Sequence, residues 1–148
     1  MSSTAQGYRC DIMTLKDCFD KGMLKKISPD SDRSVSSLKL AKHYLQRAEG
    51  NLKLEFYDVV LLMAYTAMLQ AARALLYRDG IKERSHGCVG TYLRDKYSDR
   101  LGAEIDSFDH YRENRHMIQY EGGEVEPEEA ETALKDAKTF ITKIERLL

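Results

Sequence analysis

The sequence has no excess of charge of either sign. Its 148 residues include 23 Lys and Arg and 24 Asp and Glu, which gives a formal net charge of -1. Proteins that bind nucleic acid over a broad surface usually carry a basic field, and this composition does not provide one. Any anion site must therefore be local, made by a few basic side chains.

Cysteines and long apolar runs are also scarce. The three cysteines, Cys10, Cys18 and Cys88, form no CxxC pair. Their odd number favours reduced thiols in a cytosolic protein over a disulfide framework. The longest uncharged run, Val59–Ala72, is shorter than the roughly 20 residues that span a bilayer. No signal peptide is visible at the N-terminus. These absences predict a soluble, cytoplasmic protein without membrane contact.

Most motifs of known chemistry are missing as well. There is no GxxxxGK[ST], GxGxxG or HExxH, so neither a phosphate-binding loop nor a standard zinc site is indicated. Of the histidines, His43 and His86 are expected at the surface. His110 and His116 do not have the spacing of three or four residues that places two ligands on one helix face. We therefore expect no metal and no cofactor.

The pattern of apolar residues predicts an all-α protein. No segment alternates with period two between hairpin signals, so no sheet is expected. Apolar residues recur instead at helical spacing, and the connections are short. We predict an antiparallel up-and-down helical bundle of about five to six helices. The polar residues 1–11 are expected to form a frayed tail, and residues 12–148 a single helical domain.

Two helices are expected before the central one. Thr14 can cap a short first helix, and the Ser28-Pro29 step stops helices, so that Asp30, Ser31 or Asp32 can cap the next. In this second helix, which runs from about Asp32 to Gly50, Val35 and Leu40 are predicted on the inner side. Both helices are then amphipathic neighbours of the one that follows.

The helix predicted over Phe56–Arg78 differs in kind from the others. Within it, Val59–Ala72 carries no charge on any face, which is typical of a central helix covered on several sides. Ala67 should therefore be buried, and Gly80 should end the helix in the left-handed conformation. Ser85 can cap a fourth helix, which a polar SDR turn separates from the next. Pro127 suits the first turn of the last helix.

The helix expected over Leu101–Tyr120 breaks its own pattern. Leu101, Ile105 and Phe108 share one core-facing stripe at about 100° per residue. The same steps then lead to Arg112, Arg115 and Gln119, where a helix built only for packing would carry apolar residues. Charged side chains are rarely buried unless paired. These two arginines either reach the edge of the bundle or point into a polar site.

Two interpretations of the residues around these arginines remain open. In the first, Arg112 and Arg115 form structural ion pairs with acidic neighbours such as Glu104, Asp109 or Glu131. In the second, they bind an anion, because the planar guanidinium fork suits phosphate. The second interpretation also uses neighbouring polar side chains that could hold or move a proton. The whole candidate cluster consists of His110, Arg112, Asn114, Arg115, His116 and Tyr120.

Two segments of the chain resemble HEPN domains, which are small helical bundles of prokaryotes. One is YRENRHMIQYEGG with the helix that follows it. The other is AKHYLQRAEGNL with the segment AYTAMLQAARALLYRDG. The resemblance covers about Cys18 to Leu148. It is closest to a branch of the family whose motif is an Arg followed after four residues by a Tyr. It implies antiparallel helices and commonly a homodimer. Many members of the family are metal-independent ribonucleases, often toxins paired with a small nucleotidyltransferase antitoxin.

The family's ribonuclease motif is an Arg followed after four to six residues by His. Arg115 matches the Arg, but Tyr120 stands at the His position, and His116 follows Arg115 directly. Tyrosine, with a pKa of about 10, is a poor base at neutral pH. The resemblance thus implies a module whose anion-binding part is retained while its catalytic His is replaced.

Three functions are compatible with these residues. The first is a homodimeric HEPN-type module that binds a nucleotide or RNA phosphate or a nucleotidyltransferase partner. Such a module can belong to a toxin–antitoxin system. Arg112, Asn114 and His110 would serve as its ligand-binding residues. The second is a metal-independent endoribonuclease toxin using Arg115 with His116 or Tyr120. The third is a purely structural or interaction bundle in which the arginines are only ion-paired.

Overall fold

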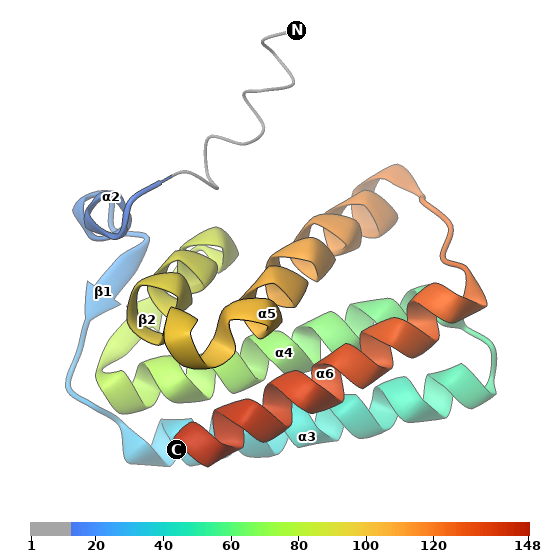
Figure 1. Ribbon diagram of the computed structural model, residues 1–148, viewed down its shortest axis with the longest axis horizontal. Helices are drawn as coiled ribbons and strands as arrows, with labels where there is room; N and C mark the ends of the chain where they lie inside the picture. The colour runs from blue at the N-terminus through green and yellow to red at the C-terminus, as the bar shows by residue number, and fades with distance from the viewer. Residues whose placement is uncertain (1–12) are drawn as a thin grey trace, which may run out of the picture.

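The computed structural model describes residues 13–148, so the tail expected at residues 1–11 lies outside the described residues. Within the described part the regular secondary structure is helical apart from two three-residue strands. The elements are α2 (Leu15–Asp20), β1 (Leu24–Lys26), α3 (Ser31–Lys53), α4 (Tyr57–Asp79), β2 (Ile81–Glu83), α5 (His86–Glu121) and α6 (Pro127–Leu147). The all-α prediction is confirmed, and Figure 1 shows the long helices packed as an up-and-down bundle.

Helix α4 lies at the centre of the bundle, as its uncharged sequence predicted. It packs against α3, α6 and α5, and Ala67 is 0% exposed. By length and mean hydropathy (1.7) α4 could also cross a membrane, but 67% of that window is buried inside the protein. Such burial is what a core helix requires. The helix ends at Gly80, whose φ of 81° is the left-handed conformation that glycine adopts without strain.

Local capping signals fix several other helix ends. The Thr14 side chain accepts a hydrogen bond from the Asp17 amide and begins α2. The Asp30 and Ser85 side chains begin α3 and α5 in the same way. Pro127 occupies the first turn of α6. The three side-chain caps give acceptors to amide groups that a helix start would otherwise leave unsatisfied, and Pro127 has no backbone N–H that needs one.

The expectation that no sheet forms was wrong. Strands β1 and β2 pair antiparallel, with Leu24 opposite Glu83 and Lys26 opposite Ile81. Three-residue strands are too short to show a period-two pattern, and the pairing joins segments far apart in the sequence. On α3, Val35 is 68% and Leu40 39% exposed, so both residues lie outside the inner face predicted for them. The buried face of α3 is therefore narrower than predicted.

The prediction of reduced thiols was also wrong for two of the three cysteines. Cys18 on α2 forms a disulfide with Cys88 in the first turns of α5, across a sequence separation of 70. Cys10 lies outside the described residues. The odd number of cysteines does not reveal such a pairing, because only the fold brings α2 beside α5.

Helix α5 contains a sharp change of direction. The backbone at Leu101 leaves the helical region (φ -130°, ψ 20°), although hydrogen bonding continues on both sides of it. In Figure 1 the first half of α5 descends to this point and the second half rises away from it. The separate fourth helix and SDR turn predicted here correspond to the first half of α5 and its bend. Leu101, Ile105 and Phe108 are all 0% exposed, as their stripe predicted.

Candidate functional site

The bend at Leu101 brings the two halves of α5 side by side. Arg94 in the first half lies 2.6 Å from Asp109 and 3.0 Å from Asp106 in the second half. In a straight helix, 15 residues would separate Arg94 from Asp109 by roughly 22 Å. Gly90 also favours this close approach, because a Cβ there would meet the Asp109 carboxylate at 2.6 Å and displace it. The folded-back helix is therefore the framework of the site.

Arg112 lies beside this framework. Its guanidinium is 3.6 Å from Asp109, and its side chain is 17% exposed. It also lines a small pocket of about 110 Å³ together with Met13, Gly87, Thr91, Arg94 and Asp109. The predicted pairing of Arg112 with Asp109 is thus present. Because Asp109 is shared with Arg94, one carboxylate serves two guanidinium groups.

Arg115 has a different environment. Its guanidinium lies over the ring of Tyr65, 5.4 Å from the ring centroid, and Nη1 donates to Gln119 Oε1 at 3.0 Å. Its Nε is buried and has no hydrogen-bond partner in the described part of the chain. No carboxylate of residues 13–148 forms an ion pair with it. The ion pair suggested as one interpretation is absent for Arg115, which keeps donor capacity for a ligand.

Tyr65 and His86 complete this side of the site, and the sequence interpretation missed both. The Tyr65 hydroxyl and His86 Nδ1 are 3.0 Å apart. Burial raises the pKa of the Tyr65 phenol above its ordinary value, while Arg115, Arg112 and Arg73 oppose that rise. Burial and the same arginines lower the pKa of His86. Both groups are therefore neutral near pH 7.

One signal in the sequence could have pointed to Tyr65. It is the hydroxyl-bearing aromatic residue within the central uncharged run, and a buried tyrosine usually finds a hydrogen-bond partner. His86 was expected at the surface because it begins a helix. It is half-buried instead, since the bend in α5 returns the second half of that helix to its own start.

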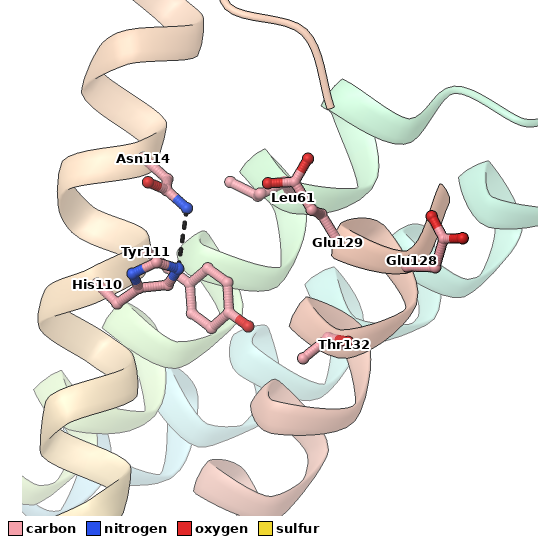
Figure 2. Close-up of a pocket in the computed structure, with 7 residues that line it drawn as sticks. All are labelled: Leu61, His110, Tyr111, Asn114, Glu128, Glu129 and Thr132. Carbon is pink, nitrogen blue, oxygen red and sulfur yellow. Dashed lines mark hydrogen bonds between the residues drawn. The ribbon is translucent and has the colours of Figure 1, made fainter. Parts of the chain in front are cut away.

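His110 and Asn114 lie apart from the arginines. They are hydrogen-bonded to each other at 3.1 Å and line a pocket of about 220 Å³ between α5 and α6. Figure 2 shows the carboxylates of Glu128 and Glu129 across this pocket from the two side chains. Acidic side chains at the mouth disfavour an anion, so these two predicted ligand-binding residues face a different chemistry from Arg112 and Arg115.

His116 and Tyr120 lie on the solvent-exposed side of α5. Their ring centroids are 4.9 Å apart, and Tyr120 is 66% exposed. At 100° per residue, Arg115 and Tyr120 point about 140° apart around the helix axis. Within one copy of the chain, the structure thus brings together Arg112 and Arg115 with Tyr65 and His86, and separates them from His116 and Tyr120. Among the described residues, no group of three His, Cys, Asp or Glu could hold a metal ion.

The HEPN domain model matches residues 35–147, which covers α4, α5, α6 and nearly all of α3, while α2 and β1 precede the matched span. No match was found among curated proteins. Because the matched span includes the central helix and the folded-back helix that carries both arginines, the chain belongs to the HEPN domain family.

Proposed function

We propose that this HEPN domain binds the phosphate groups of RNA through Arg115, assisted by Arg112. The observation that carries the proposal is the state of Arg115: its Nε is buried without a hydrogen-bond partner in the described part of the chain. Its positive charge has no paired carboxylate there. A buried donor left unsatisfied costs about 1–3 kcal/mol, and a phosphate oxygen would remove that cost.

The local balance of charge supports the same ligand. Arg94 and Arg112 face Asp106 and Asp109, so these four charges cancel. Arg115 then adds one positive charge beside a neutral tyrosine and a neutral histidine. A small positive surplus in an otherwise balanced protein fits the expectation that any anion site is local. If the arginines served only in structural ion pairs, a carboxylate would be expected beside Arg115 as well.

Binding of a short single-stranded RNA in EDTA tests this function. Arg115→Ala should weaken binding by about 10- to 100-fold, which corresponds to a charged hydrogen bond of about 1.5–3 kcal/mol. It should also reduce the slope of log affinity against log salt by about one phosphate contact. Fluorescence anisotropy at several salt concentrations measures both quantities.

Arg47→Ala is the matched control for this test. Arg47 also lies over a tyrosine ring, that of Tyr44 at 5.8 Å, but on α3 and away from α5. Its substitution should leave the affinity unchanged. If Arg115→Ala and Arg47→Ala bind RNA alike, Arg115 has only a structural role and the proposal fails.

The same samples address the ribonuclease alternative. The contact between His116 and Tyr120 is the one observation that favours it, because these rings adjoin on the helix that carries Arg115. The side chains of His116 and Tyr120 point in other directions from the helix axis than Arg115 does. This separation favours binding of RNA without rapid cleavage. Cleavage of the RNA in EDTA that is lost in both Arg115→Ala and His116→Ala would make this alternative the correct one.

We further propose a symmetric homodimer with the second half of α5 at its interface. Met117 is 53% and Tyr120 66% exposed on this helix, and an isologous contact would cover both side chains in each copy. Sedimentation at micromolar concentration should show a dimer, and Met117→Lys should dissociate it. Leu54→Lys, at a residue 62% exposed on the α3–α4 connection, is the control.

A monomer at that concentration would contradict the dimer. The exposed Met117 and Tyr120 would then be available to contact a different protein, such as the small nucleotidyltransferase that accompanies many HEPN toxins. A mixture of both proteins in the same sedimentation experiment would reveal that complex as a faster-moving species.

A further inference from the structure

His86 differs from the other histidines of the described chain in what surrounds it. His43, His110 and His116 are exposed, whereas His86 is half-buried. Its Nδ1 is 3.0 Å from the Tyr65 hydroxyl, and its ring centroid is 5.9 Å from that of Tyr65. Because Arg115 lies over the same tyrosine ring, Tyr65 holds the imidazole and the guanidinium in fixed positions on one support.

Charged groups from three elements face His86. Arg73 comes from α4, Glu83 from β2, and Arg112 and Arg115 from the second half of α5. Arg73 is neutralised by Glu83 through two hydrogen bonds of 2.9 and 3.3 Å. Arg112 forms an ion pair with Asp109. The charge that Arg115 contributes therefore remains uncompensated beside the ring.

The hydrogen bond to Tyr65 leaves one ring nitrogen available. Nε2 has no hydrogen-bond partner among residues 13–148, and the Tyr65 bond fixes the orientation of the ring. From this arrangement we propose that His86 is a third ligand of the phosphate bound by Arg115 and that it takes up a proton from solvent as the phosphate binds. This inference rests on the proposed function, since it assigns a further residue to the same anion site.

The direction of the coupling follows from the charges. In the free protein, burial and then Arg115 and Arg73 lower the pKa of His86 from its ordinary value of 6.5. A bound phosphate offsets the charge of Arg115 and accepts a hydrogen bond from the imidazolium, so the pKa of His86 rises in the complex. Affinity should then increase as the pH falls through the pKa of the complex. Once the pH lies above both pKa values, His86 is neutral in both states and the coupling vanishes.

The probe for this coupling is a short oligothymidylate. Neither its phosphodiesters nor its bases titrate between pH 5.5 and 8, and it lacks the 2′-hydroxyl needed for cleavage. Because a pKa rise of one unit corresponds to a tenfold change in affinity, we expect roughly three- to tenfold tighter binding at pH 5.5 than at pH 8. Calorimetry in buffers of different ionisation enthalpy should detect proton uptake at pH 6.

Two substitutions separate the roles of the two ring nitrogens. His86→Gln keeps a hydrogen-bonding group near the position of Nε2 but cannot titrate, so it should bind as tightly as the wild type at pH 8 and show no gain at pH 5.5. His86→Asn keeps a partner for Tyr65 but does not reach the ligand, and it should lose the gain and some affinity at both pH values. His43→Gln, at an exposed histidine on α3, is the control and should keep the wild-type profile.

The possible outcomes distinguish this inference from the function on which it rests. If the wild type binds neither the oligothymidylate nor the single-stranded RNA at any pH, the proposed function fails. If binding depends on Arg115 but its pH profile is the same in the wild type and in His86→Gln, only the role of His86 is refuted. A gain at low pH that disappears in His43→Gln instead would assign the proton to the exposed histidine and overturn the inference. Circular dichroism confirms that each variant is folded.

Discussion

Reduction of the Cys18–Cys88 disulfide is expected to lower the free energy of unfolding by about 2–4 kcal/mol. The bond closes a loop with a sequence separation of 70, and a loop of that size loses about 4 kcal/mol of chain entropy in the unfolded state. Disulfides typically contribute about 2–4 kcal/mol to stability. For a domain of this size the unfolding midpoint should fall by about 5–15 °C.

The bond matters locally because α2 has few other means of staying in place. Helix α2 has six residues, and isolated helices of that length are not stable in water. Cys18 is 0% exposed and is the one fully buried residue of α2. Without the bond, α2 would depend on the short β1–β2 pairing and on a few partly buried side chains.

Thermal unfolding with and without a thiol reductant measures this effect. The Cys18→Ala/Cys88→Ala double variant should reproduce the reduced protein, and a reductant should not change it further. Cys10→Ser is the control, because it removes the third thiol and should leave the reductant effect intact. Equal midpoints for the oxidised and reduced wild type would show that the bond does not stabilise the fold.

Phe108→Ala is expected to lower the free energy of unfolding by about 3–5 kcal/mol, the usual range for a fully buried aromatic residue. Phe108 is 0% exposed. Its ring stacks with Tyr65 of α4 at 5.4 Å and with Phe140 of α6 at 5.9 Å. Its removal leaves a cavity where α4, α5 and α6 meet, and it removes the packing beneath the tyrosine that supports Arg115.

Urea unfolding gives the free energy for this variant. Phe108→Leu should cost less, because it fills part of the cavity. Phe56→Ala is the matched control, since Phe56 is 53% exposed and its substitution should change stability by less than about 1 kcal/mol. If Phe108→Ala and Phe56→Ala cost the same, Phe108 does not hold the three helices together.

Part of the candidate site could be predicted from periodicity. The stripe Leu101, Ile105 and Phe108 is buried, and its continuation leads to Arg112 and Arg115, which are partly buried. The same periodicity could have separated Arg115 from Tyr120, which a motif based on linear spacing treats as partners. Tyr65 and His86 could not be assigned together, because they are 21 residues apart and belong to different helices.

The sequence by itself determined the features that depend on neighbours along the chain. Caps at Thr14 and Ser85, the left-handed end at Gly80, the uncharged run of α4 and the start of α6 at Pro127 are all local, and each was predicted. Tertiary structure alone decided the β1–β2 pairing, the Cys18–Cys88 bond and the fold-back of α5 at Leu101. These join residues that are far apart in sequence, and their partners are selected by the packing of the whole bundle. The unsatisfied hydrogen-bond donor of Arg115 was also decided by the tertiary structure. Whether a charged side chain lies beside a carboxylate depends on which residues the fold places next to it.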